Sequence, residues 1–186
     1  VWKMREVMGG LGYPVSVTLA PKTRDDQPGA LYEGTDYRLL GEAADQALLM
    51  TYEWGYSRGQ PMAVAPVNLV RRVVDYAVSR IPREKLLLGI PNYGYDWPLP
   101  FRQGETTARS IGNVEAVRLA AEKGAEIFYD ETSQAPYFHY QADGVSHVVW
   151  FEDARSIQAK LQVVEDYGLA GTGYWQIMRM FRVNWL

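Results

Sequence analysis

Three short apolar segments of this chain each end abruptly in aromatic, polar and glycine residues. They are Leu48–Tyr56, Leu86–Trp97 and Ala170–Ile177. A continuous apolar run of this length is typical of a strand that is buried on both faces, as in a parallel sheet. The loops that leave the carboxyl ends of parallel strands are where α/β folds place their binding sites. The repetition therefore predicts an α/β fold with a site at one end of its sheet.

The composition is that of a globular domain and argues against two classes of partner. The chain has 186 residues, of which 47% are apolar and 22% charged, enough for one domain with a sizeable core. Nineteen basic and 22 acidic residues give a net charge of −3 without a basic run, so we expect no nucleic-acid partner. No apolar run approaches the roughly 20 residues of a membrane span, so we expect no membrane partner.

The chain has few residues that bind transition metals. It contains no cysteine, which excludes disulfides and cysteine–metal sites, and its two histidines, His139 and His147, lie in one polar, aromatic segment. A metal bound by both is conceivable, but two histidines on a half-exposed hairpin is the better interpretation. We therefore predict no metal site.

Secondary-structure signals alternate along most of the chain. Apolar or β-branched runs predict strands at 15–20, 46–52, 86–91 and 170–175. Apolar periodicity predicts helices at 1–8 and 67–80, and a short helix is expected at 36–44. Ser110 or Asn113 is expected to cap a helix that runs to Glu122, and Asp153 to cap a last helix. Such β/α units favour a right-handed parallel arrangement, and four of them make half of an eight-stranded barrel. A flavodoxin-like open sheet is the alternative, but it normally has short loops and a glycine-rich or acidic first turn, which we do not find.

The region 101–152 departs from this alternation. Short strands at 125–129, 136–141 and 146–151 follow the helix at 113–122, which predicts a small α+β insertion. We therefore expect a partial barrel at 1–100, the insertion at 101–152, and the last helix and strand of the barrel at 153–186. The segment 92–97 is expected to be the loop that leaves the third strand. The first residues read as the middle of an amphipathic helix, so we expect the chain to begin inside a larger protein.

Several segments, in order along nearly the whole chain, resemble glycoside hydrolase family 18. Met50–Glu53, Leu88–Gly94 and Gly173–Trp175 are similar to its sixth, seventh and eighth strands, and Val17–Pro21 to its fifth. Further segments are similar to its spore cortex-lytic branch, the YaaH/SleL-like peptidoglycan hydrolases and N-acetylglucosaminidases: Met50–Gly55, Val64–Pro66, Gly94–Pro98 and Trp150–Ser156. The resemblance implies the C-terminal half of a (β/α)8 TIM barrel, strands 5–8, with the α+β insertion between strands 7 and 8.

The resemblance also implies a substrate-assisted glycosidase without metal or organic cofactor. In family 18, one Glu protonates the leaving oxygen while the 2-acetamido carbonyl of the sugar attacks the anomeric carbon. That Glu closes an Asp-x-x-Asp-x-Asp-x-Glu motif on the fourth strand, and no stretch of this chain spells the motif. We therefore expect the chain alone to be inactive, with a non-catalytic chitin- or peptidoglycan-binding relative as the alternative.

The same comparison implies roles for five residues. Tyr52 matches the tyrosine that holds the acetamide, which would make it catalytic, and Trp175 matches the tryptophan under the sugar. Glu53, Asn92 and Tyr93 are expected to bind substrate. The alternatives are a core position for Tyr52 and Trp175, and for Glu53 an ordinary ion pair with one of two basic residues, Arg58 or Lys22.

Other residues near these motifs are weaker candidates. Each of them either lines the cleft or packs within the fold: Tyr95, Trp97, Trp150, Glu152 and Gln176. The tail 178–185 departs from the pattern of the spore branch, so we assign it no role in the site.

The resemblance implies a polysaccharide partner, peptidoglycan or a chitin-like glycan, and an extracellular location in the bacterial cell wall, spore coat or cortex. A half barrel would also have open sheet edges, which predicts possible self-association with a second copy.

Overall fold

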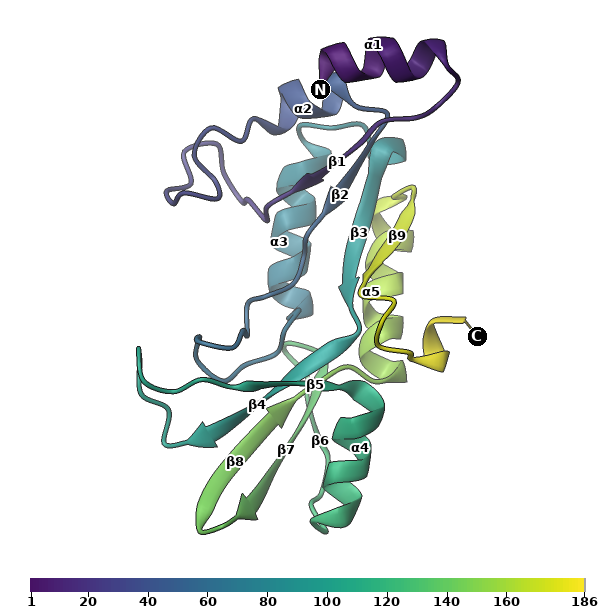
Figure 1. The fold of residues 1–186 in the computed structure, drawn as a ribbon. Coiled ribbons are helices and arrows are strands. Elements are labelled where there is room, and N and C mark those ends of the chain that lie inside the picture. The colour runs from purple at the N-terminus through teal and green to yellow at the C-terminus, as the bar shows by residue number, and fades with distance from the viewer. Residues whose placement is uncertain (186) are drawn as a thin grey trace. The chain divides into compact units, whose positions relative to one another are not determined.

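The structure, a computed structural model, describes residues 1–185 and divides into two compact units. The first unit comprises Val1–Thr51, Val70–Ile90 and Leu161–Gly173. The second comprises Tyr52–Leu69, Pro91–Lys160 and the segment from Tyr174 on. The chain thus passes between the units several times, and each unit is assembled from distant parts of the sequence (Figure 1).

A four-stranded sheet in the order β1-β2-β3-β9 contains the predicted apolar strands. Its strands are β1 (Ser16–Leu19), β2 (Gln46–Leu49), β3 (Leu86–Pro91) and β9 (Gly171–Trp175). β1 pairs with β2 in parallel, and β2 pairs with β3 in parallel, with Leu49 opposite Leu88. The four strand predictions are confirmed, although β2 ends three residues before its predicted end. The parallel pairing brings the carboxyl ends of β2 and β3 together, as a β/α fold requires.

The predicted helices are also present. They are α1 (Trp2–Gly10), α2 (Tyr37–Ala43), α3 (Val67–Val78), α4 (Asn113–Glu122) and α5 (Ala154–Tyr167). The structure also has two 3₁₀ turns, η1 (Arg83–Lys85) and η2 (Arg182–Trp185). The Asp153 carboxylate accepts a backbone N–H bond at the start of α5, which confirms that predicted cap, and Asp36 caps α2 in the same way. The predicted cap of α4 by Ser110 or Asn113 is wrong, because Gly112 occupies the cap position and no side chain bonds there. None of the helices within residues 1–185 is long and apolar enough to cross a membrane.

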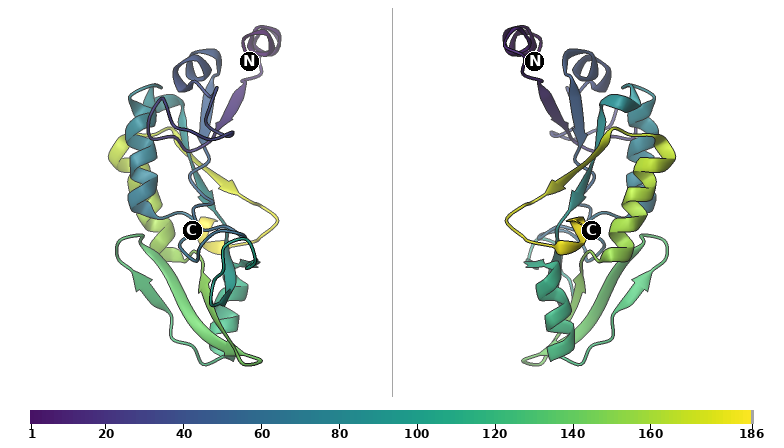
Figure 2. Two further views of the ribbon diagram at one scale, coloured as in Figure 1. Left: turned by 90° about the vertical axis from the view of Figure 1, so that its left-hand side faces the viewer. Right: turned by 90° about the vertical axis from the view of Figure 1, so that its right-hand side faces the viewer.

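Helices α3 and α5 lie on one face of this sheet, and no helix of residues 1–185 covers the opposite face (Figure 2). Ala47 and Leu49 are fully buried, whereas Leu48, between them on the strand, stays partly exposed. Its partner in β3, Leu87, is also partly exposed. The expectation that these strands are buried on both faces is therefore wrong for this chain, because an apolar row remains on the uncovered face.

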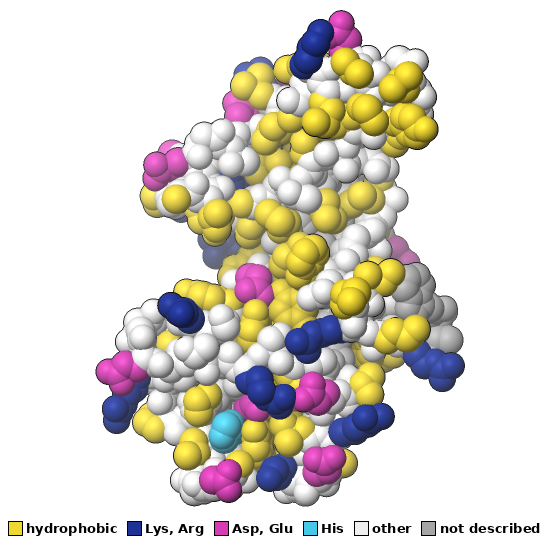
Figure 3. All heavy atoms as spheres, in the orientation of Figure 1, with side chains coloured by type: hydrophobic (Ala, Val, Ile, Leu, Met, Phe, Trp, Pro, Cys, Tyr) yellow, Lys and Arg dark blue, Asp and Glu magenta, His cyan; other side chains and the backbone are white. Residues whose placement is uncertain are grey.

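Apolar side chains also remain on the outside of α1. The helix has no buried residue, and Trp2, Met4 and Val7 are more than half exposed. Apolar side chains are visible on the surface in this part of the molecule (Figure 3). The amphipathic stripe read from the sequence thus has no partner among the described residues. An apolar stripe of this kind normally faces other parts of a core.

A five-stranded sheet in the order β5-β4-β8-β7-β6 forms most of the second unit. Its strands are β4 (Tyr93–Leu99), β5 (Arg109–Gly112), β6 (Phe128–Asp130), β7 (Ala135–Ala142) and β8 (Val145–Trp150). All of its described pairings are antiparallel. His139 and His147 lie on the β7–β8 hairpin as predicted, and His147 Nδ1 lies 2.8 Å from Asp96 Oδ1.

The prediction of a loop at 92–97 is wrong, because β4 begins at Tyr93, and β5 was not predicted at all. Tyr93, Tyr95 and Trp97 alternate with smaller or polar residues, and this period of two is the signature of a strand. All three side chains belong to one buried apolar cluster. At Gly94 a Cβ atom would stand 2.0 Å from the Trp150 carbonyl oxygen, so only glycine permits the close approach of β4 and β8.

A buried ion pair holds the segment after β8 to α5. Lys160 Nζ lies 2.8 Å from Glu152 Oε2, and both side chains are at most 1% exposed. Burial raises the pKa of the Glu152 carboxyl, although the ammonium of Lys160 opposes that rise. The Asn113 Oδ1 atom, at the start of α4, accepts the backbone N–H of Glu152 and joins α4 to the same point.

Candidate functional site

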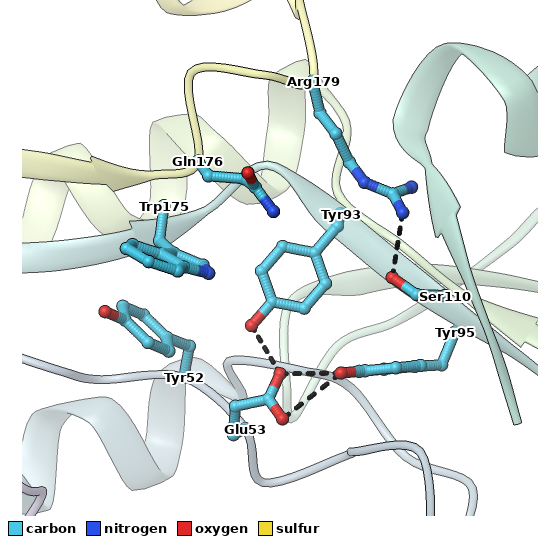
Figure 4. A pocket seen from close by; sticks show the side chains of 8 residues that line it. All are labelled: Tyr52, Glu53, Tyr93, Tyr95, Ser110, Trp175, Gln176 and Arg179. Carbon is cyan, nitrogen blue, oxygen red and sulfur yellow. Dashed lines mark hydrogen bonds between the residues drawn. The ribbon is translucent and has the colours of Figure 1, made fainter. Parts of the chain in front are cut away.

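Eight residues of the second unit line a cavity of about 220 Å³ (Figure 4). They come from the segments that follow β2 and β9 and from the neighbouring strands β4 and β5: Tyr52, Glu53, Tyr93, Tyr95, Ser110, Trp175, Gln176 and Arg179. Two of the three apolar segments singled out in the sequence thus lead directly into one site, since Tyr52 follows β2 and Trp175 ends β9. The third contributes through β4.

Glu53 lies at the centre of a hydrogen-bond network in this cavity. The Tyr93 hydroxyl donates to Oε1 at 2.5 Å, and the Tyr95 hydroxyl lies 3.0 Å from Oε1 and 3.2 Å from Oε2. The backbone of Glu53 has a φ of +66°, a left-handed conformation that is uncommon for a residue with a side chain. Backbone of this kind tends to persist where surrounding contacts hold it, often at binding sites.

The alternative that Glu53 pairs with Arg58 or Lys22 is wrong. Within residues 1–185 the carboxylate forms no ion pair, and tyrosine hydroxyls are its partners. The Lys22 ammonium instead donates to three backbone carbonyl oxygens, those of Asp25, Tyr32 and Thr35. It is therefore used within its own loop.

Burial and the charge of Glu53 keep the tyrosine hydroxyls protonated. Burial raises the pKa of Tyr93 far above its usual range, and the hydrogen bond to Glu53 adds to the rise. The pKa of Tyr95 is raised by burial first and by the Glu53 charge second. A protonated phenol donates one hydrogen bond. Both tyrosines donate theirs to the Glu53 carboxylate and so fix its orientation.

Tyr52 and Trp175 lie next to each other at one end of the cavity (Figure 4), where Tyr52 is partly buried against the apolar cluster of β4. Trp175 is 55% exposed, so it is not the core residue that a tryptophan ending a strand could have been. Burial raises the pKa of Tyr52, as does the charge of Glu53, so this hydroxyl is neutral at physiological pH. In the described part of the chain it has no hydrogen-bond partner, which leaves it available to a ligand.

Asn92 does not line the cavity. Its side chain is buried, its Oδ1 accepts a bond of 2.6 Å from Asn184 Nδ2, and its backbone N–H donates to the Trp175 carbonyl at 2.7 Å. The residue therefore fixes the end of β9, and with it Trp175, and does not face the cavity.

Three lining residues were not expected to be in the site, or were only weak candidates. Arg179 belongs to the tail that we had excluded, and its Nη2 donates to Ser110 Oγ at 3.1 Å. Gln176, which we had considered a weak candidate, lines the cavity directly after Trp175. The only signal in the sequence was proximity to Trp175, since nothing there predicts that the tail folds back to β5.

The remaining weak candidates separate clearly. Trp97 is fully buried and donates its indole N–H to the Gly59 carbonyl, so it is a core residue. Trp150 stacks on Tyr137 with ring centroids 4.6 Å apart and lines a different cavity. Glu152 is buried with Lys160. Of the five weak candidates, Tyr95 and Gln176 line the cavity described above, and Trp97, Trp150 and Glu152 do not.

The arrangement is suited to a neutral sugar that carries an amide. An exposed indole can stack on the apolar face of a pyranose, with a large contact area and a small loss of side-chain entropy. The neutral hydroxyl of Tyr52 can donate to an amide carbonyl, and the oriented Glu53 carboxylate can accept from an N–H or O–H group. Aromatic walls with a few convergent polar groups are typical of small-molecule sites.

Comparison with known proteins identifies the family. Residues 4–179 match Glycosyl hydrolases family 18. The chain is 46% identical over 183 residues to the "Cortical fragment-lytic enzyme" of Bacillus subtilis (strain 168), which covers 98% of this chain and 42% of the relative. The chain therefore spans less than half the length of this curated relative.

Solved structures give the same result. The spore cortex-lytic enzyme SleL of Bacillus megaterium QM B1551 matches with a TM-score of 0.93 and 44% identity, over 99% of this chain and 42% of that one. A chitinase from Chromobacterium violaceum ATCC 12472 matches with a TM-score of 0.90 and 32% identity, over 99% and 57%. The α/β fold, with its parallel and antiparallel sheets, thus corresponds to part of the TIM-barrel structures of these hydrolases, and the chain belongs to glycosyl hydrolase family 18.

Proposed function

We propose that this chain forms the acetamide-holding and sugar-stacking wall of a glycosidase that cleaves N-acetylglucosamine-containing glycans by substrate-assisted, retaining catalysis. The observation that carries the proposal is the cavity between Tyr52, Glu53 and Trp175. It combines an accessible indole, a phenol without a partner and an oriented carboxylate. In this proposal the four parallel strands are strands 5–8 of a (β/α)8 barrel, with the α+β insertion between strands 7 and 8.

Tyr52 is the catalytic residue of this wall. In substrate-assisted cleavage the 2-acetamido carbonyl oxygen attacks the anomeric carbon as the glycosidic bond breaks, and an oxazolinium ion forms. The Tyr52 hydroxyl, neutral because its pKa is raised, donates to that carbonyl oxygen and holds it in the attacking position. Positioning the nucleophile in this way lowers the entropic part of the barrier.

Trp175 and Glu53 bind the sugar around this reaction. The apolar face of the pyranose stacks on the exposed Trp175 ring. Glu53 accepts a hydrogen bond from the acetamide N–H or from a sugar hydroxyl, and Tyr93 and Tyr95 hold the carboxylate for this contact. Asn92, which we had expected to bind substrate, acts behind the site through the end of β9.

The general acid of the reaction is supplied by a strand outside this sequence, because the Asp-x-x-Asp-x-Asp-x-Glu motif does not occur in it. Without a group that protonates the leaving oxygen, the chain binds sugar and does not hydrolyse it. The alternative is a non-catalytic glycan-binding relative, and the residues found at the position of that Glu in the preceding strand decide between the two.

The polysaccharide that we propose as substrate is peptidoglycan, and the location is the cell wall, spore coat or cortex of a bacterium. The support is the 46% identity to a protein named for cortical fragment lysis and the 44% identity to a spore cortex-lytic enzyme. No metal or organic cofactor enters the proposed reaction.

The proposal is tested by measuring reducing ends released from cortex fragments and from chitin oligomers. The 186-residue chain is compared with a protein in which the preceding family 18 strands, including the acid motif, are joined upstream of Val1. We expect turnover only from the joined protein, with retention of the anomeric configuration. A folded joined protein with an intact acid motif that binds glycan without cleaving it would favour the non-catalytic alternative.

A further inference from the structure

We propose that Arg179 recognises a carboxylate on the bound glycan, so that the site prefers an acidic N-acetylated sugar to a neutral one. The inference rests on the proposed function, since it assumes that the cavity holds an N-acetylated sugar. It concerns a residue for which the sequence indicated no role.

The guanidinium of Arg179 is fixed at the wall of the cavity. Its Nη2 donates to the neutral hydroxyl of Ser110 at 3.1 Å (Figure 4). Its Nη1 lies against Gly112, where a Cβ atom would stand 3.6 Å away. The backbone N–H of Arg179 donates to the Gln176 carbonyl at 3.2 Å, which closes a turn directly after Trp175. The turn from Gln176 to Arg179 therefore places the guanidinium at the site.

Arg179 forms no ion pair among the described residues, since no carboxylate lies within 4 Å of its guanidinium. Glu115 is near enough for the charge of Arg179 to help lower its pKa, but its carboxylate pairs with Arg109 at 2.6 Å. A guanidinium has five N–H donors, and the bond to Ser110 uses one of them. The unused donors form the planar fork that binds a carboxylate through two parallel hydrogen bonds.

The two charged side chains that line the cavity, Glu53 and Arg179, would contact different parts of the ligand. The Glu53 carboxylate, with Tyr93 and Tyr95 on it, lies beside Tyr52, while Arg179 projects from the opposite side, beside Ser110 (Figure 4). A neutral N-acetylglucosamine satisfies Tyr52 and Glu53 but leaves Arg179 unpaired. A sugar with an added acidic substituent satisfies all three groups.

Glycans of bacterial walls offer this carboxylate in two places. It stands on the lactyl ether at O3 of N-acetylmuramic acid, or at the end of a peptide attached to that ether. The recognition chemistry is the same for both, so the ligands of the experiment must separate them.

The test is a titration of the 186-residue chain, followed by tryptophan fluorescence at low ionic strength. The ligands are N-acetylglucosamine, N-acetylmuramic acid, its methyl ester, N-acetylmuramyl-L-alanine and the methyl ester of the latter. Each acid and its ester have nearly the same size, so their ratio of Kd values isolates the contribution of the charge. The variants are Arg179→Met, Arg179→Lys and, as a matched control on the same exposed tail, Arg182→Met.

We expect one acid to bind about tenfold more tightly than its ester, the effect of charge-assisted hydrogen bonds at a partly exposed site. The ratio should fall to about one in Arg179→Met, take an intermediate value in Arg179→Lys, and persist in Arg182→Met. The acid that shows the preference identifies the lactyl or the peptide carboxylate as the ligand. Added salt should reduce the ratio.

Two negative results are distinguishable. If the chain binds N-acetylglucosamine but each acid and its ester bind equally, the role of Arg179 is overturned and the proposed function stands. If a folded chain binds none of the five ligands, the sugar site itself is overturned, and the inference falls with it.

Discussion

Glu53 combines a left-handed backbone conformation with a carboxylate that accepts hydrogen bonds from two tyrosine hydroxyls. Either hydroxyl could bind water or ligand, but both point to Glu53, so the carboxylate is oriented before any ligand arrives. Tyr52, one residue earlier, keeps its hydroxyl unpaired among the described residues. Tyr93 and Tyr95 thus orient the carboxylate, and in the proposed function Tyr52 is left to contact the ligand.

Removing the Tyr52 hydroxyl should slow catalysis more than it weakens binding. In the joined protein, we expect Tyr52→Phe to lower kcat about 100-fold with little change in KM, a typical cost of deleting one donor that acts in the transition state. The measurement is steady-state hydrolysis of a chitin oligomer. Tyr13→Phe is the matched control, because Tyr13 is 60% exposed and does not line the cavity. A Tyr52→Phe enzyme with unchanged kcat would remove the acetamide role.

The raised pKa of Tyr93 makes the stability of the chain sensitive to alkaline pH. The folded state holds this proton more tightly than the unfolded state, whose tyrosine pKa is about 10. Above pH 10 the unfolded chain loses the proton first, so the free energy of unfolding falls as pH rises. We expect Tyr93→Phe to reduce that fall by up to about 1.4 kcal/mol per pH unit, measured by urea denaturation between pH 9 and 11. An unchanged slope would show that Tyr93 titrates alike in both states.

Part of the candidate site could be predicted from the sequence. Tyr52 and Glu53 come shortly after an apolar strand and Trp175 ends another, and the three residues singled out by strand prediction and family motifs line one cavity. Their roles in binding and catalysis stay predictions. Arg179 and Ser110 could not be predicted, because their meeting depends on a tail that folds back to an unpredicted strand. Asn92 was assigned to the wrong side, since neighbouring residues on an extended chain point in opposite directions.

Strand β4 shows how an element can be missed when its residues resemble a loop. Glycine, asparagine and proline around 92–98 favour a turn by composition. The alternating aromatic residues nevertheless bury one face against β8, and Gly94 permits the contact that a side chain would block. The parallel strands were easier to predict, because an uninterrupted apolar run is explained by burial alone.

The Glu152–Lys160 pair predicts how firmly the segment after β8 is attached to α5. Lys160→Met leaves a buried, unpaired carboxylate, so we expect it to lower the free energy of unfolding by about 3–5 kcal/mol. Adding Glu152→Met to the same chain should recover much of the loss, because both charges are then gone. The measurement is urea denaturation at neutral pH.

The exposed pair Lys3–Glu6 provides the control for this cycle. Both of its side chains are largely exposed, and Lys3→Met should cost less than about 1 kcal/mol. If Lys160→Met were as mild as Lys3→Met, the buried pair would not hold the segment after β8 to α5.

For the whole molecule, the uncovered face of the parallel sheet is the main consequence of the fold. Leu48 and Leu87 lie on that face, β1 and β9 form the two edges of the sheet, and α1 exposes an apolar stripe. In a closed barrel such a face would be interior. The apolar runs of the sequence indicated strands buried on both faces. They could not show that the helices of this chain cover only one face of the sheet.

We predict that the isolated 186-residue chain associates with itself as its concentration rises, because each buried leucine side chain contributes about 1.5–3 kcal/mol. Sedimentation velocity over a hundredfold concentration range measures this. Leu48→Gln should shift the distribution toward monomer, whereas Leu31→Gln, a change at an exposed leucine of the loop before α2, should not. A monomer at all concentrations would mean that the open face is protected in another way.

We propose that the cavity of this chain holds an N-acetylated sugar in the attacking conformation, without the acid that completes the reaction. Calorimetric titration of the 186-residue chain with a thiazoline analogue of N-acetylglucosamine, which mimics the oxazolinium intermediate, tests this proposal. We expect saturable binding that is tighter than for N-acetylglucosamine and is weakened in Tyr52→Phe and Trp175→Ala. A folded chain that binds the analogue no better than the parent sugar, or binds neither, would contradict it.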